Sequence, residues 1–413
     1  MSSSDLPLTR AAQADIAALG VTQVIGYGTL YYSFGTLAPD IARDLGWPKE
    51  WVFGALSVAL MVGGLVAPMV GRWLDRVGAG RLMAAGSVAA ALSLIACALA
   101  PSYYVFVPAL LAIEIASTFV QYSAAFPLLV QNHPAIAQRC IVYLTLIAGF
   151  SSTLFWPLTT WLQSQFDWRE IYLLFAGMNL LICLPLHVWL AGRGRPVPAL
   201  RPQPSEISDA LTHGSLPQRD RMKGFLLMVT AFACQSFVNS AVLVLMLPML
   251  SSLQLGAAGV TVSALFGPSQ VAVRLINMLF GRQLSQLALA ILAATLLPAS
   301  LLILAATAPA FAGAIVFAVL FGMGNGVQTI VLGTLPLRLF GTQGYGARQG
   351  RVMAVRLTIG SAAPFAFSLM TDHAGPREAL MAAALIGCGA VASFAAIGWL
   401  VRHPTPQPAP AQP

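Results

Sequence analysis

The sequence predicts an all-α membrane protein with twelve transmembrane helices in two six-helix halves, and three observations lead to this class. The 413 residues are 58% hydrophobic and only 9% charged, too little charge to cover the surface of a water-soluble globule. The apolar residues form about twelve runs of roughly 20 residues, and a helix of that length crosses the bilayer core. The sequence also repeats its motifs after about 210 residues.

Each apolar run is predicted to be a helix, because a helix satisfies its own backbone hydrogen bonds within lipid. The first six are expected at 16–38, 51–71, 82–100, 103–127, 140–162 and 169–191. The second six are expected at 223–250, 259–281, 286–307, 310–332, 352–371 and 377–401.

One long polar stretch divides the chain and sets the domain boundaries. It is rich in arginine and proline, which is typical of a linker rather than of a membrane span. We therefore predict an N-terminal six-helix bundle at 1–191, a cytosolic linker at 192–222 and a C-terminal six-helix bundle at 223–403. The Pro/Ala/Gln-rich tail at 404–413 is predicted to be disordered.

The basic residues lie mainly on one side of the predicted membrane, at the ends of the apolar runs. This spread does not form one patch, so the net charge of +8 predicts no nucleic-acid partner. The positive-inside rule instead places this side, with both termini, in the cytosol. Nearly all basic residues are arginine, with lysine only at Lys49 and Lys223. This bias favours a GC-rich bacterial source and hence a bacterial inner membrane.

Similar motifs recur at corresponding positions of the two halves, as Trp168-Arg169-Glu170 and Pro376-Arg377-Glu378 show. A repeat of six spans preserves topology, and such architectures carry a solute site near the midplane between halves that rock against each other. No catalytic motif and no phosphate-binding Walker A loop is present, so an enzyme is not expected and an ion or solute gradient would supply the energy. No metal site or cofactor is expected, because the five cysteines have no short spacing.

The loop after the second predicted helix carries the strongest motif of the chain. The segment 71–81 reads Gly-Arg-Trp-Leu-Asp-Arg-Val-Gly-Ala-Gly-Arg and resembles the signature loop of the major facilitator superfamily, G-x-x-x-D-R-x-G-x-x-R. The resemblance implies that fold and a cytosolic gate formed by Gly71, Asp75, Arg76, Gly78 and Arg81. Its physical basis is clear, since glycine allows close helix approach and tight turns and a carboxylate is stabilised at a helix N-terminus. In the second half a serine replaces the aspartate, so a weaker contact is expected there.

Further segments resemble narrower branches of that superfamily. Residues 32–35, 45–47 and 62–65 resemble the oxalate/formate antiporter and monocarboxylate branch, and residues 149–158 and 322–326 resemble the bacterial arsenite-efflux carriers. In the oxalate-type branch, a basic residue on helix 8 and another on helix 11 clamp the anionic substrate. Arg274 and Arg356 occupy those helices here.

Charged residues inside membrane helices are expensive and are candidates for function. Arg274 shares one helix face with Gln270 and Asn277, and we expect this face to line the solute path. Arg356 is a second candidate for substrate binding. It lies about four residues from the predicted start of its helix, so snorkelling to the interface is an equal alternative.

Glu114 is the only acid deep inside a predicted helix. One interpretation is a proton carrier, because a desolvated carboxylate holds its proton more readily. The other is a structural hydrogen bond or ion pair with an adjacent helix. An ion pair with an arginine would weaken the carrier interpretation.

Other polar residues complete the predicted solute site, namely Tyr31, Gln235, Asn239 and Asn325. Each alone could equally serve as a contact between helices. Cys183 and Cys234 are soft ligands for trivalent arsenic or antimony, although small apolar filling is the simpler interpretation.

These features predict a secondary active transporter that works by alternating access and exports small toxic oxyacids such as arsenite or antimonite, conferring resistance. One alternative keeps the fold and carries or exchanges small carboxylates, and another is a membrane receptor that moves no solute. The expected partners are a small-molecule solute, a coupling proton or counter-solute and the lipid bilayer. The chain is expected to act as a monomer.

Overall fold

The computed structural model describes residues 8–193, 214–256, 258–281 and 284–403. Within these ranges the chain is helical and contains no strand, and eleven helical segments are long and apolar enough to cross a membrane. A further helical segment at residues 10–44, which is rich in glycine and tyrosine, completes the twelve predicted spans. The predicted all-α class is confirmed.

The N-terminal half builds its six spans from continuous and interrupted helices. These are α1 (Arg10–Tyr27), the π-helix η1 (Gly28–Tyr32) and α2 (Ser33–Asp44); α3 (Lys49–Val77); α4 (Ala79–Ala98); α5 (Tyr103–Val120) with α6 (Tyr122–Asn132); the short η2 (Pro134–Ile136) with α7 (Ala137–Ala148) and α8 (Ser151–Gln163); and α9 (Trp168–Met178), the π-helix η3 (Asn179–Cys183) and α10 (Leu184–Arg193).

Residues 194–213 of the predicted linker lie outside the described part, as does the predicted tail, and the helices of the C-terminal half begin within the last residues of that linker. The elements of this half are η4 (Gln218–Asp220), α12 (Arg221–Ser252), α13 (Ala258–Ala264) with α14 (Phe266–Phe280), α15 (Gln286–Thr307), α16 (Phe311–Phe340), α17 (Tyr345–Ala374) and α18 (Pro376–Arg402).

Two helices of this half extend well beyond their predicted ends. The tenth predicted span ended at 332, whereas α16 continues to Phe340, and the eleventh was predicted from 352, whereas α17 starts at Tyr345. The first two turns of α17 are polar, so hydropathy did not detect them, whereas residues 333–340 of α16 are mostly apolar and buried and continue that helix through Pro336. α16 ends before Gly341 and α17 begins after Gly344. These two glycines adopt positive φ angles of 75° and 62°, a conformation that favours glycine.

Other spans are interrupted where the sequence predicted continuous helices. The fourth span breaks at Gln121, whose backbone is extended, and the fifth breaks between α7 and α8 at Gly149 and Phe150. A break inside a membrane helix is tolerated where neighbouring groups satisfy the freed backbone atoms. π-helical turns such as η1 and η3 are often found at functional sites.

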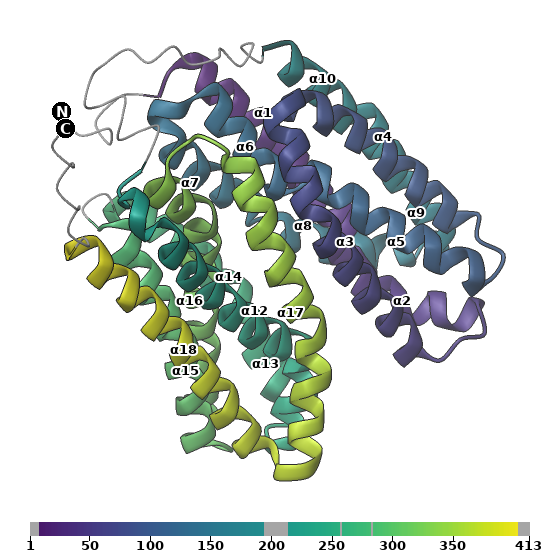
Figure 1. Cartoon of the computed structure of the whole chain (residues 1–413). Helices are drawn as coiled ribbons and strands as arrows, with labels where there is room; N and C mark the ends of the chain where they lie inside the picture. Colours follow the sequence, from purple (N-terminus) through teal and green to yellow (C-terminus); the bar gives the residue numbers. More distant parts are fainter. Residues whose placement is uncertain (1–7, 194–213, 257, 282–283, 404–413) are drawn as a thin grey trace, which may run out of the picture.

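The two halves meet along α3 and α17, which run side by side. A methyl group on Gly71 would overlap the carbonyl oxygen of Gly346, and one on Gly350 would overlap that of Ala67, so these backbones touch only because glycine has no side chain. Figure 1 shows the halves in contact at the end that carries the start of α1 and the end of α18. They diverge toward the end that carries α2 and the turn between α17 and α18.

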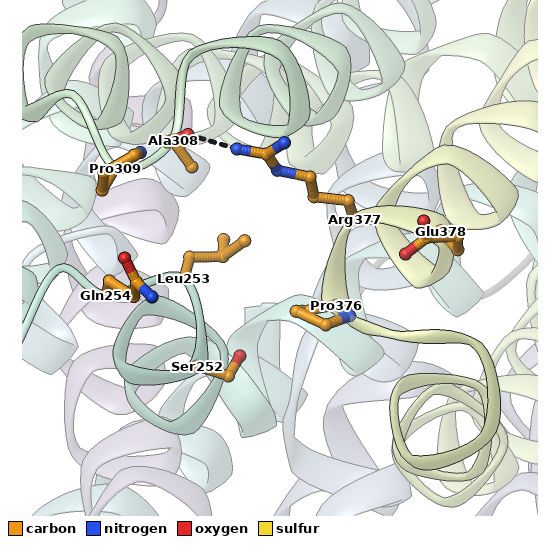
Figure 2. Close-up of a pocket in the computed structure, with 8 residues that line it drawn as sticks. All are labelled: Ser252, Leu253, Gln254, Ala308, Pro309, Pro376, Arg377 and Glu378. Atoms are coloured by element: carbon orange, nitrogen blue, oxygen red, sulfur yellow. Dashed lines mark hydrogen bonds between the residues drawn. The ribbon is translucent and has the colours of Figure 1, made fainter.

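The repeat is visible at that opposite end. Arg169 donates to the carbonyl oxygens of Ala98 and Ala100 and pairs with Asp44 at 2.8 Å, while Arg377 donates to the carbonyl oxygen of Ala308 at 2.6 Å. In the second half, the surface hollow beside this arginine has a volume of about 250 Å³ and is drawn in Figure 2. It lies at the end of the C-terminal half and includes none of the residues predicted to bind the solute.

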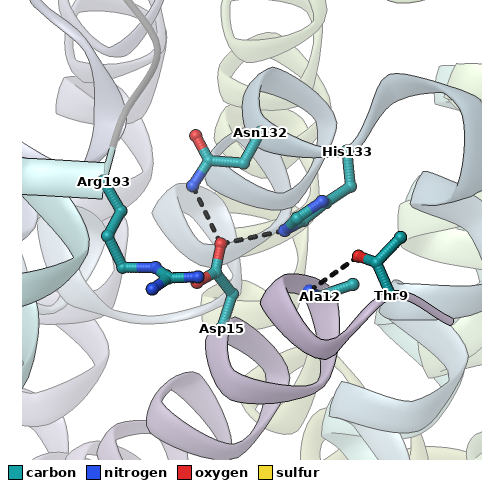
Figure 3. A network of polar contacts seen from close by, with 6 residues as sticks. All are labelled: Thr9, Ala12, Asp15, Asn132, His133 and Arg193. Carbon is teal, nitrogen blue, oxygen red and sulfur yellow. Dashed lines mark hydrogen bonds and ion pairs between the residues drawn. The ribbon is translucent and has the colours of Figure 1, made fainter.

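A buried polar network joins three elements of the N-terminal half at the end where the halves meet (Figure 3). Asp15 in α1 is 2% exposed. Its carboxylate accepts hydrogen bonds from Asn132 at 3.1 Å and from Arg193 at 3.0 Å, and it lies 2.9 Å from Nε2 of His133. The network therefore ties the last residue of α10 to α1 and to the end of α6.

We expect Asp15→Ala to lower stability by about 3 kcal/mol, because removing one partner of a buried pair leaves the others uncompensated. Arg193→Ala should cost less, since the Arg193 side chain is 36% exposed and Asp15 would keep its other two contacts. Thermal unfolding of both variants in detergent measures the difference. An equal or larger loss for Arg193→Ala would contradict this account.

Candidate functional site

Arg274 lies at the centre of the candidate site. It is 5% exposed, and its guanidinium donates four hydrogen bonds. Two go to side chains, Gln270 Oε1 and Thr329 Oγ1, both at 3.2 Å. The other two go to the backbone carbonyls of Gly326 and Thr145, both at 3.3 Å. None of the ion pairs among the described residues includes Arg274.

One of these bonds crosses from one half to the other. Arg274 belongs to α14, whereas Thr145 lies in the last turn of α7, and its carbonyl oxygen accepts from the N–H of Gly149 at 3.1 Å as well as from Arg274. A positive charge at a helix C-terminus is favoured by the helix dipole. A methyl group on the adjoining Gly149 would overlap the guanidinium, so glycine at the break makes room for the arginine.

Arg356 occupies the middle of α17 rather than its end, because this helix starts seven residues earlier than predicted. It lies close enough to Tyr27, Tyr31 and Tyr32 to interact electrostatically, and all three belong to the other half. Its Nε atom is buried and has no hydrogen-bond partner in the described part of the chain. The residue as a whole is half-buried, and its place 11 residues into α17 favours a role at the seam over snorkelling to the interface.

The π-helix η1 presents tyrosines to this region. The rings of Tyr31 and Tyr32 meet edge to face with centroids 5.3 Å apart, and Tyr27 packs against Tyr122 of α6 at 4.8 Å. Tyr31 is 44% exposed although it interacts with Arg356 of the other half. Its exposed surface therefore adjoins residues of both halves.

Glu114 lies in α5 and is 6% exposed. Its backbone packs against α3, where a methyl group on Gly63 would lie 3.2 Å from the Glu114 carbonyl oxygen. The Oε1 atom has no hydrogen-bond partner among the described residues, and no ion pair within them includes this acid. The predicted competing ion pair is thus not seen, and Tyr31 is near enough to interact with the carboxyl group.

The remaining residues predicted to bind the solute do not all lie beside Arg274. Gln235 and Asn239 are buried on α12, and Asn239 donates to Gln328 of α16. Asn325 is half-buried one turn before Thr329 and accepts from its hydroxyl through the backbone carbonyl. Asn277 does not join Arg274, since its side chain lies beside Gly281 at the end of α14.

The predicted gate residues lie where α3 meets α17. The Asp75 carboxylate accepts from the backbone N–H groups of Gly346 and Ala347 at 2.9 and 2.8 Å, which are the first residues of α17 after Tyr345. This is the favourable position for an anion at a helix N-terminus. The counterpart Ser285 instead caps its own helix by accepting from Ala288, so it makes no such contact between halves.

The other loop residues do not join this contact. Gly78 adopts a φ angle of 96°, as its place in the tight turn between α3 and α4 requires. Arg76 and Arg81 are exposed. Gly71 allows the close approach of α3 and α17 described above.

The two candidate thiols do not converge. Cys183 is buried in η3 among residues of the N-terminal half, whereas Cys234 lies beside Gly389 of α18. Among the described residues, no group of histidine, cysteine or acidic side chains could hold a metal ion.

Helical spacing in the sequence already groups Gln328 and Thr329 with Asn325 and predicts Thr145 as a polar position of its helix. The structure differs for Thr145, which acts through its backbone carbonyl rather than its side chain. Sequence reasoning missed Tyr122, which comes near Arg274 beyond the break at Gln121.

Two helical bundles whose seam carries the buried Arg274 together with further polar side chains define a multi-pass membrane carrier. The sequence matches the Major Facilitator Superfamily over residues 19–368, and the chain belongs to that family. It is accordingly a transporter and not an enzyme. No protein of curated function matches the chain by sequence.

Solved structures agree with this fold. The human organic anion transporter MFSD10 (TETRAN) is 14% identical with a TM-score of 0.69, and the match covers 94% of this chain and 100% of that one. The E. coli fucose:proton symporter FucP is 14% identical with a TM-score of 0.69, covering 94% and 99%. The proton:xylose symporter XylE bound to 6-bromo-6-deoxy-D-glucose is 14% identical with a TM-score of 0.67, covering 94% and 96%. Identities this low show the fold alone.

Proposed function

We propose that this secondary transporter exports small toxic oxyacids such as arsenite or antimonite, and so confers resistance. The observation that carries the proposal is the polar seam, where Arg274 of one half donates to the Thr145 carbonyl of the other. Around it lie mainly uncharged hydrogen-bonding groups, namely tyrosine hydroxyls, amides and backbone carbonyls. Such groups suit a small hydroxylated solute.

Alternating access would open and close the seam between the two halves on either side of the membrane. With both termini in the cytosol of a bacterial inner membrane, as the arginine distribution indicates, the contact between α3 and α17 closes the cytosolic side. Gly71 and Asp75 maintain that contact, while Gly78, Arg76 and Arg81 shape the adjoining loop. Inward opening separates Asp75 from the first residues of α17, and a monomer suffices for the cycle.

Proton coupling is assigned to Glu114. A buried carboxyl group without a charged partner is most stable when protonated, and rocking of the halves changes its access to water. Loading on one side and release on the other would couple a proton to the solute. Tyr31 is within electrostatic range of both Glu114 and Arg356, which relates this acid to the seam.

A second candidate is the transport or exchange of small carboxylates such as oxalate or lactate. It is favoured by the two arginines, since neither pairs with an acid among the described residues. An anion held by Arg274 and Arg356 would supply the missing negative charge.

Transport by purified protein in liposomes separates the candidates. We expect arsenite to cross in proportion to an imposed pH gradient, with no competition from oxalate or lactate. Flux of oxalate without flux of arsenite would replace the first candidate with the second. No flux of any solute would favour a receptor over a transporter.

A further inference from the structure

Three buried amide side chains between α12 and α16 have more hydrogen-bonding atoms than partners. Gln235, Asn239 and Gln328 are 1%, 6% and 3% exposed. One hydrogen bond joins them, from Nδ2 of Asn239 to Oε1 of Gln328. Both polar atoms of Gln235, Oδ1 of Asn239 and Nε2 of Gln328 find no partner within the described ranges.

Such a cluster is costly to maintain. A buried polar group without a partner destabilises a protein by about 1–3 kcal/mol, and native proteins rarely retain several together. An apolar side chain of similar shape would fold more stably at each position. The amides are therefore expected to have partners at some stage of the transport cycle.

The helices that carry the cluster also contact both arginines of the candidate site. Gln328 precedes Thr329, whose hydroxyl accepts from Arg274 at 3.2 Å. Gln235 precedes Ser236, whose hydroxyl donates to the backbone carbonyl of Arg356 at 2.7 Å. The amides and the groups that contact the two arginines therefore lie on the same two helices and at the same level along them.

The unpaired atoms define the chemistry of that solute. Gln235 offers one NH2 group and one carbonyl oxygen, and the bonded pair of Asn239 and Gln328 also leaves one NH2 group and one carbonyl oxygen without a partner. Exchanging the two amide atoms of any residue cannot remove this balance, because each bond uses one donor and one acceptor. A carboxylate only accepts and would leave both oxygens unpaired, whereas a hydroxyl group both donates and accepts.

We propose that Gln235, Asn239 and Gln328 form a subsite for a small uncharged polyhydroxy solute, either an undissociated oxyacid or a polyol. The inference rests on the proposed transport function and narrows its substrate class. The charge of Arg274 does not require an anionic solute, because four of its N–H donors are already satisfied by neutral groups of the protein. The amides are the groups that gain most from such a ligand.

Direct binding tests the subsite without requiring transport. Calorimetry on purified protein would use arsenous acid, the polyol erythritol and oxalate as probes, beside thermal unfolding of each variant. Gln235→Met keeps the side-chain length and removes both unpaired atoms. We expect it to weaken binding of arsenous acid or erythritol at least tenfold, to leave oxalate binding unchanged and to leave the unfolding midpoint equal or higher.

The matched control is Gln349→Met. Gln349 is also fully buried in this half, and its Oε1 also lacks a partner among the described residues, but its Nε2 donates to the carbonyl oxygen of Leu332 at 3.3 Å. Its loss should therefore lower the midpoint and leave binding unchanged. Which probe binds distinguishes an oxyacid from a polyol. The subsite is refuted if Gln235→Met lowers the midpoint without weakening binding, or if oxalate alone binds. Binding without flux in liposomes would refute the transport proposal and leave the subsite intact.

Discussion

Replacing Arg274 with alanine is expected to abolish transport while the protein still reaches the membrane. The substitution removes four hydrogen bonds, one of them between the halves. Hydrogen bonds to charged groups contribute about 1.5–3 kcal/mol each, so the loss of two alone corresponds to about 100-fold or more in flux. Initial rates in proteoliposomes, normalised to inserted protein, measure the effect.

Two further variants make this result specific. Arg274→Lys keeps the charge but not the planar fork, so we expect an intermediate rate at least about tenfold below that of the original chain. Arg402→Ala changes an exposed arginine at the end of α18 and should leave flux unchanged. Full flux in Arg274→Ala would mean that the buried arginine serves packing only.

Replacing Gly71 with alanine is expected to open the end of the molecule where the halves now meet. The added methyl group would overlap the carbonyl oxygen of Gly346, and backbone cannot move aside as a side chain can. Overpacking costs about 1–3 kcal/mol, which shifts a two-state equilibrium by about 5- to 150-fold. Distances between spin labels at the exposed positions Arg72 and Arg351 should lengthen, and transport should fall.

Gly54 provides the matched control on the same helix. A methyl group at Gly54 would meet no atom within 4 Å, so Gly54→Ala should leave both the label distances and the flux unchanged. Equal effects of the two substitutions would show that helix propensity, and not the contact with α17, accounts for the loss. An unchanged distance in Gly71→Ala would remove the role assigned to this contact.

The sequence located the helices of the site better than it located the contacts. Arg274 and Gln270 were correctly placed on one face of α14, because the spacing of a helix is fixed. Asn277 shares that face in principle, but the helix ends soon after it and its side chain turns to Gly281. Arg356 was placed too near a helix end, because hydropathy does not detect the polar first turns of α17.

The amino-acid sequence alone determined that the chain spans a membrane twelve times in two related halves. Those features depend on composition, run length and repeat, which are local properties of the chain. Only the tertiary structure decided which polar atoms are paired. Gly149 at the break after α7 leaves room for Arg274 to reach the Thr145 carbonyl. The π-helix η1 brings Tyr31 and Tyr32 near Arg356, and the packing of α12 on α16 leaves Gln235 unpaired within the described ranges. Hydrogen bonds between segments more than 100 residues apart depend on how whole helices pack, and no local pattern encodes that packing.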